Sequence, residues 1–221
     1  MSGCTEDRFL RDTSNHSMEI IQDDGVHRHM SFTDNGSSVY RFDLITWPGH
    51  LCISGDCGTY VFSRLHDMLE FFRMDKSDFN HSKDRKLNIN AGYWGEKLQA
   101  TGTQEGYKRY SEEILKSTLL EITEDRWEFE TDEEKEDVMQ QLNDYVLDCF
   151  EGDESHDYSI ANEFKSDYGH AFIDLFDHSF KEYTFHYIWC LYAIVYGIGI
   201  YDQSKQSKPR QRNALICRKG D

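Results

Sequence analysis

The sequence predicts an α+β protein with an N-terminal antiparallel sheet and a strongly acidic, helical C-terminal half. Three observations lead to this fold class: turn dipeptides separate short apolar segments early in the chain, apolar residues recur at helical spacing later, and the acidic surplus lies in the helical part. With 221 residues, 38% of them hydrophobic, the chain can form the core of one ordinary domain or two small ones.

The first third predicts a meander of about five strands with a covering helix. Strands are expected at residues 17–22, 26–32, 39–47, 50–54 and 59–62, separated by turn signals at Asp24-Gly25, Asn35-Gly36, Pro48-Gly49 and Gly55-Asp56. In the third strand, Tyr40, Phe42 and Leu44 alternate with polar residues, which is typical of a strand with one buried face. Apolar residues at helical spacing in 65–72 then predict a helix over the sheet.

Three regions follow from the change of pattern along the chain. Residues 1–105 hold the sheet and its helix, and 106–204 form an acidic helical region. Residues 205–221 carry six Lys or Arg and one Asp, so they predict a basic, flexible tail.

The helical region contains two clear helix starts. Ser111 precedes apolar residues at helical spacing, and Thr131 forms a capping box with Glu134 ahead of a helix predicted over 131–150. Further helices are predicted at 159–165, 171–178 and 179–201. The apolar run 187–201 is too short to span a membrane, so it predicts a buried core helix, with part of a homodimer interface as an alternative.

The acidic surplus is the main functional signal. Residues 121–177 hold 20 Asp and Glu against 3 Lys and Arg, a balance that equals the net charge of the chain, −17. Carboxylates spaced along one side of the predicted helix 131–150 could take the place of phosphates in a basic groove. We expect the partner-binding residues to be Glu133, Asp137, Asp144, Asp148, Glu151, Asp153 and Glu154. The alternative is that they form only the solvated face of an amphipathic helix.

Two smaller residue sets have alternative interpretations. Trp47, Trp94 and Trp127 are candidate interface anchors, because Trp is enriched in binding hot spots, or else core residues. His170, Asp174 and His178 recur every four residues on the predicted helix 171–178 and its approach, so they are candidate ligands of a divalent metal or an acid–base pair. Packed or surface histidines are the alternative.

No nucleotide-binding, hydrolase or kinase motif is found, so we predict a binding protein without a cofactor rather than an enzyme. The negative charge disfavours nucleic acid and membranes as direct partners. A protein or complex with a basic groove is the expected partner. A metal-dependent hydrolase acting on a nucleotide or nucleotide signal is the alternative.

Three stretches carry a family resemblance: YRFDLITWPGHLCISGDCGTYVFSRLHDMLEFFR (40–73), LNINAGYWGEKLQA (87–100) and FHYIWCLYAIVYGIGIYD (185–202). They resemble accessory proteins of tailed bacteriophages and prophages. The resemblance implies a protein that acts in the host cytoplasm on host machinery or host defence, and it supplies no catalytic residues. Together with the acidic surplus, it leads us to expect an inhibitor that binds a host defence or nucleic-acid-handling complex by imitating nucleic acid.

Overall fold

The computed structural model describes residues 3–74, 87–102 and 106–207. It confirms the α+β class, with an antiparallel sheet in the N-terminal part and helices concentrated after it. The chain divides into two compact units. We call residues 1–104 with 185–221 the sheet unit, and residues 105–184 the acidic unit.

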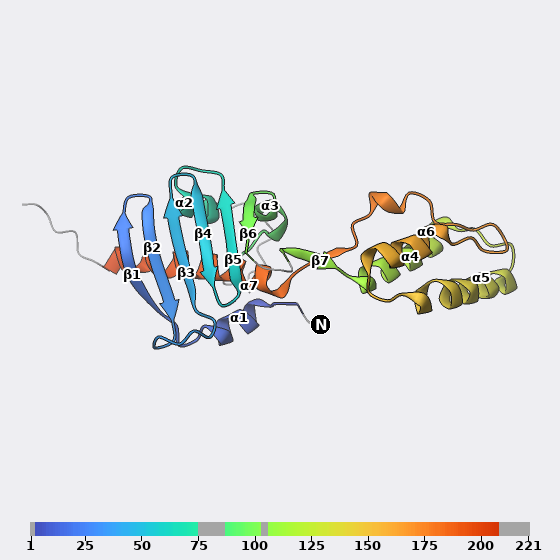
Figure 1. The fold of residues 1–221 in the computed structure, drawn as a ribbon, viewed down its shortest axis with the longest axis horizontal. Coiled ribbons are helices and arrows are strands. Elements are labelled where there is room, and N and C mark those ends of the chain that lie inside the picture. Colours follow the sequence, from blue (N-terminus) through green and yellow to red (C-terminus); the bar gives the residue numbers. More distant parts are fainter. Residues whose placement is uncertain (1–2, 75–86, 103–105, 208–221) are drawn as a thin grey trace, which may run out of the picture. The chain divides into compact units, whose positions relative to one another are not determined.

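The sheet unit is built on a six-stranded antiparallel meander whose strands neighbour one another in chain order (Figure 1). The strands are β1 (Ser17–Asp24), β2 (His27–Thr33), β3 (Phe42–Trp47), β4 (His50–Gly55), β5 (Gly58–Ser63) and β6 (Leu98–Thr101). Gly25 and Gly49 turn their hairpins at φ of 60° and 82°, a conformation that favours glycine. The first five strands confirm the predicted meander, whereas β6 comes from a segment that the sequence assigns to no strand.

One face of the sheet is apolar because alternate residues of its central strands point to it. Met30, Phe32, Leu44, Leu51, Ile53, Tyr60 and Phe62 are all fully buried. Three shorter helices belong to this unit: α1 (Glu6–Asp12), α2 (Met68–Met74) and α3 (Ala91–Gly95). The predicted helix 65–72 corresponds to α2, which contacts β4 and has Met68 and Leu69 buried.

The longest helix, α7 (Phe185–Ser207), crosses the strands of the sheet unit and contacts β1, β3 and β5 (Figure 1). Its run 187–201 is a buried core helix as predicted, with Tyr187 and Trp189 fully buried. The predicted region 106–204 is therefore divided at Thr184, because the apolar surface that α7 covers belongs to the sheet. None of the helices in the described ranges is long and apolar enough to cross a membrane.

Close packing fixes the middle of α7. A Cβ atom built on Gly197 would lie 2.7 Å from Leu44 Cδ1 and 3.0 Å from Phe32 Cζ. A side chain at this position would therefore push the helix away from the sheet. Gly199 lies two residues later, and a Cβ atom built on it has no atom within 4 Å.

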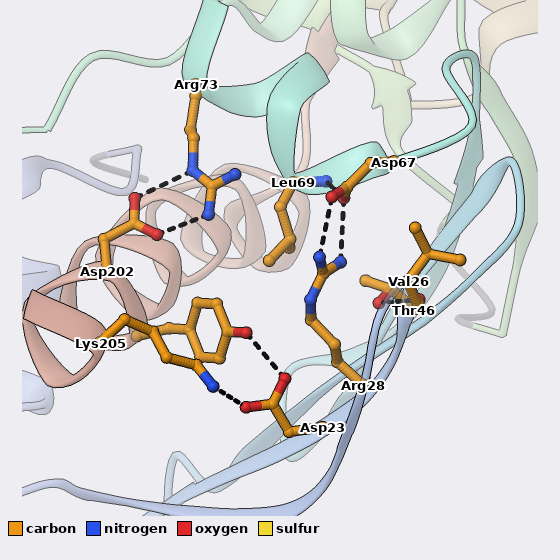
Figure 2. Close-up of polar contacts among 10 residues, drawn as sticks. Asp23, Val26, Arg28, Thr46, Asp67, Leu69, Arg73, Asp202 and Lys205 are labelled. Atoms are coloured by element: carbon orange, nitrogen blue, oxygen red, sulfur yellow. Dashed lines mark hydrogen bonds and ion pairs between the residues drawn. The ribbon is translucent and has the colours of Figure 1, made fainter. Parts of the chain in front are cut away.

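Ion pairs fix the last turns of α7 (Figure 2). Arg73 of α2 donates to both carboxylate oxygens of Asp202, and Asp23 of β1 accepts from Lys205 and, at 2.9 Å, from the Tyr201 hydroxyl. Beside them, Arg28 donates to both oxygens of Asp67, at 2.9 and 2.8 Å. Each carboxylate of this cluster thus has its own base. Because α7 continues to Ser207, the predicted tail 205–221 begins inside a helix, and residues 208–221 lie outside the described part of the chain.

The acidic unit is a small helical body closed by a two-stranded ribbon. Its elements are β7 (Lys108–Tyr110), α4 (Glu112–Arg126), α5 (Asp132–Tyr145), the 3-10 turn η1 (Leu147–Cys149), α6 (Glu154–Glu163), the 3-10 turn η2 (Leu175–Asp177) and β8 (Lys181–Tyr183). Leu115, Leu119, Leu142, Val146 and Ala161 are fully buried in its core. Strands β7 and β8 pair antiparallel, so the chain enters and leaves the unit at adjacent positions. In chain order, the acidic unit is an insertion between β6 and α7.

One predicted helix of this region is wrong, and two others have different bounds. Residues 171–178 form only the turn η2, since Asp174 adopts a left-handed conformation with φ of 62° that a helix does not accept. The helix predicted over 179–201 starts at Phe185, because residues 181–183 pair with β7 instead. The helix predicted over 159–165 lies earlier, as α6.

Candidate protein-binding surface of the acidic unit

The net negative charge of the chain belongs to the acidic unit. Residues 105–184 hold 24 Asp and Glu and 7 Lys and Arg, a balance of −17. The sheet unit holds 17 acidic and 17 basic residues, so its formal charge is zero. A field that attracts basic partners therefore originates in the acidic unit.

Helix α5 presents the first part of the acidic row. Thr131 caps it by accepting from the Glu134 amide at 3.1 Å, while Glu134 accepts from the Glu130 amide at 2.9 Å. Val138 and Leu142 anchor the opposite side in the core. Helical spacing then places Glu133, Asp137 and Asp144 on the exposed side.

The row does not continue along one helix as predicted. Helix α5 ends at Tyr145 rather than near residue 150, since the chain turns at Val146, which is fully buried, into η1. Asp148 lies in that turn and Glu151 in the loop after it, both exposed. All five carboxylates are exposed, but only three of them share a helix.

Asp153 and Glu154 begin α6 and have local partners. The Asp153 carboxylate caps the helix by accepting from the His156 amide at 2.9 Å, and Glu154 forms an ion pair with Lys181 at 3.1 Å. Both remain exposed. Their contribution to a binding surface is therefore smaller than that of unpaired carboxylates.

Asp157 has a structural function in the same helix. It is fully buried and accepts from the Tyr110 hydroxyl at 2.8 Å and from the amides of Glu151 and Gly152 at 2.9 and 3.1 Å. Burial and this hydrogen bond raise the pKa of Tyr110. Asp157 thereby holds the loop carrying Glu151 against β7.

A groove of about 590 Å³ lies between α5 and the end of α6. Four carboxylates line it with one base, Lys165; they are Asp137, Asp144, Glu163 and Asp167. Gln141 joins the two sides, since its amide donates to Asp137 at 3.2 Å and to Asp167 at 3.3 Å. Tyr145, 67% exposed, stands at the edge. We call this hollow the acidic groove, and its lining suits a Lys or Arg side chain.

A second hollow of about 720 Å³ lies on another side of α6, between that helix and residues 176–181. Tyr158, Phe176 and Phe180 line it together with polar residues, which include the ion pair of Glu154 with Lys181, and Phe176 is 73% exposed. We call it the apolar groove. Neither groove could be predicted from the sequence, because each forms between segments whose contact no local pattern predicts.

The three Trp residues that are candidate anchors have different environments. Trp94 is 1% exposed and packs edge-on against Phe72 with ring centroids 4.8 Å apart, so it is a core residue and not an accessible anchor. Trp127 is half-buried beside Phe172 and His170. Trp47 is half-buried and stacks on His50 in the sheet unit. Only the last two have exposed surface.

The candidate metal ligands are not brought together. His170 packs on Trp127, and its Nε2 atom lies 3.3 Å from Glu134 Oε1. Asp174 is exposed in the turn before η2, and His178 stacks on Phe180. Their helical spacing is lost with the helix itself. Within the described ranges, no three His, Cys, Asp or Glu residues are grouped as a metal site would require.

Comparisons with known proteins give no relative. No protein-family model matches the chain, and no curated protein or solved structure matches it either.

Proposed function

We propose that the protein acts by binding, and that the acidic unit docks on a basic surface of another protein that handles nucleic acid. The observation that carries this proposal is the division of charge, −17 on the acidic unit and zero on the sheet unit. A rigid set of carboxylates attracts the Lys and Arg side chains that otherwise hold phosphates, and it also raises the rate of association.

The geometry supports a protein partner over a solvated face alone. The acidic groove collects four carboxylates from two helices and the loop that follows α6. Two exposed tyrosines accompany them. Tyr145 lines the groove, and Tyr168 forms a hydrogen bond with Asp137 that raises the pKa of Tyr168. Aromatic residues are enriched at protein interfaces, and the carboxylates beside them give electrostatic complementarity to a basic partner.

The phage context belongs to the proposal. We propose an inhibitor made in the host cytoplasm that occupies the basic groove of a host defence or nucleic-acid-handling complex. This part rests on the resemblance of residues 40–73, 87–100 and 185–202 to phage accessory proteins. We prefer a binding function to that of a metal-dependent hydrolase, because His170, Asp174 and His178 have separate surroundings.

Affinity purification with matched charge reversals tests the proposal. One bait carries Asp137, Asp144, Asp148 and Glu151 changed to Lys, and the control bait carries the same change at Glu19, Asp24, Glu70 and Glu96, which are exposed residues of the sheet unit. Both change the net charge equally. We expect a partner from a bacterial lysate that the wild type and the control retain, that the acidic-unit variant loses, and that double-stranded DNA displaces.

The matched control separates location from total charge. Equal recovery by all three baits would mean that the acidic row is only a solvated face. Equal loss by both variants would mean that attraction depends on net charge and not on this surface.

A further inference from the structure

The apolar groove is unusual in its setting. It lies in a unit with a formal charge of −17, yet Phe176 at its edge is 73% exposed. Exposed aromatic side chains are enriched at protein interaction sites. The core does not need Phe176, since Phe172, Leu175 and Phe180 of the same segment are buried in it.

Helix α6 separates the two grooves. Ile160, Glu163 and Phe164 line the acidic groove, whereas Tyr158, Ser159 and Asn162 line the apolar one. A hydrogen bond of 2.9 Å between Ser159 and Glu163 lies on the ridge between them. An α-helix with its side chains is about 10 Å across, and an extended chain covers about 3.3 Å per residue. A segment crossing α6 therefore spans the ridge with about three residues.

We propose that the apolar groove binds a bulky aliphatic or aromatic side chain of the partner protein, from a segment that also places a Lys or Arg in the acidic groove. The two side chains lie three or four residues apart in an extended segment. Charge complementarity selects this occupant, because a purely apolar segment would leave the carboxylates of the neighbouring groove without a counter-charge. This inference rests on the proposed function, which supplies the basic partner.

Short peptides of defined sequence test this rule. The lead peptide is fluorescein-labelled Arg-Arg-Gly-Ser-Leu-Gly; its matched forms replace Leu by Ser, replace both Arg by Gln, or move Leu next to Arg. Each is titrated into the full-length protein by fluorescence anisotropy. We expect the lead peptide to bind about tenfold more tightly than the Ser and adjacent-Leu forms, since burial of a Leu side chain contributes an effect of this order.

Protein variants locate the contact. Phe176→Ser should weaken the lead peptide about tenfold and leave the Ser peptide unchanged, while Ile173→Ser, exposed but outside the groove lining, should change neither. Asp144→Asn, in the acidic groove, should weaken every Arg peptide more than Asp148→Asn does. Circular dichroism checks that each variant remains folded.

The outcomes separate the two proposals. Equal affinity of the Leu and Ser peptides would overturn the apolar contact and leave the basic partner standing. Equal affinity of the Arg and Gln peptides, or no binding of any peptide at millimolar concentration, would overturn both. Self-association of the free protein that Phe176→Ser abolishes would assign the groove to a second copy and overturn the proposed occupant.

Discussion

The sheet unit and the acidic unit hold their charges in different ways. In the sheet unit, Arg28, Arg73 and Lys205 pair with Asp67, Asp202 and Asp23, and the formal charges of the whole unit cancel. In the acidic unit, 24 carboxylates share 7 bases, so most have no basic partner. Mutual repulsion destabilises a compact body. Ion pairing within the fold therefore accounts for the charges of the sheet unit but not for those of the acidic unit.

The largest expected effect tests whether the units unfold separately. Asp157→Ala would leave the Tyr110 hydroxyl and two amides without their buried acceptor. We expect the free energy of unfolding of the acidic unit to fall by about 3 kcal/mol. Hydrogen exchange should then rise in residues 106–184 and stay unchanged in the sheet strands. An equal rise in both would show one cooperative body; Asp148→Ala, at an exposed position, is the neutral control.

The next effect is confined to the sheet unit and compares two glycines of α7. Gly197→Ala should lower stability by about 1–2 kcal/mol, because the new methyl group overlaps Leu44 and Phe32. Gly199→Ala should raise stability by up to about 1 kcal/mol, since that position is open and alanine favours helix. Chemical denaturation of both variants measures the difference. A stabilising Gly197→Ala would contradict close packing of α7 on the sheet.

Acid should reduce the stability of the sheet unit. Burial alone would raise the pKa of Asp67, but the Arg28 guanidinium and the Leu69 amide outweigh it and hold that pKa below the ordinary value. Stability from Asp67 is thus complete above about pH 4, the pKa of an unfolded Asp, and is lost as the pH falls through the lower folded value.

Hydrogen exchange at pH 7, 5 and 3 checks this loss in the sheet strands. Asp67→Asn should reduce the loss in the sheet unit on acidification and leave the acidic unit unaffected. An equal loss in the wild type and in Asp67→Asn would contradict the contribution of the Arg28–Asp67 ion pair.

The smallest expected effect concerns the cost of the charge. Changing Asp137, Asp144 and Asp148 to Asn and Glu151 to Gln should raise the melting temperature of the acidic unit by about 2 °C, because like charges on neighbouring turns repel. The matched neutralisation at Glu19, Asp24, Glu70 and Glu96 should leave the sheet unit nearly unchanged. Calorimetry of both variants makes the comparison. A stability gain with loss of partner binding would mean that the charge is kept for binding.

Local patterns predicted most of the fold, and long-range packing explains what they missed. Alternation at Phe42 and Leu44 and the turn glycines were sufficient for the meander. The predicted strand 39–47 starts too early, because Tyr40 precedes β3 with a left-handed φ of 52°. The apolar run of α7 predicted a buried helix but not the surface that this helix covers. That surface depends on long-range contacts such as the one between Gly197 and Leu44. The phenylalanines around Asp174 have helical spacing, yet its left-handed backbone and the pairing of β8 prevent the helix.

The candidate surface was predictable in composition and not in shape. The sequence identified Glu133, Asp137 and Asp144, which α5 presents on its exposed side. It did not identify Glu163 and Asp167, which join the acidic groove only through packing of α6 against α5 and the Gln141 hydrogen bonds. Burial of Trp94 likewise depends on Phe72, a residue distant in sequence.

The insertion of the acidic unit before α7 sets an order of events on the ribosome. Strands β1 to β6 emerge first, but the helix that covers their apolar face follows only after the complete acidic unit. The apolar face of the sheet, which includes Met30, Phe32 and Leu44, therefore lacks its covering helix α7 while residues 105–184 are synthesised. At about 5–20 residues per second this interval lasts from about 4 to 16 seconds. During that time the nascent chain exposes a surface that chaperones recognise, next to a highly charged unit that opposes its aggregation.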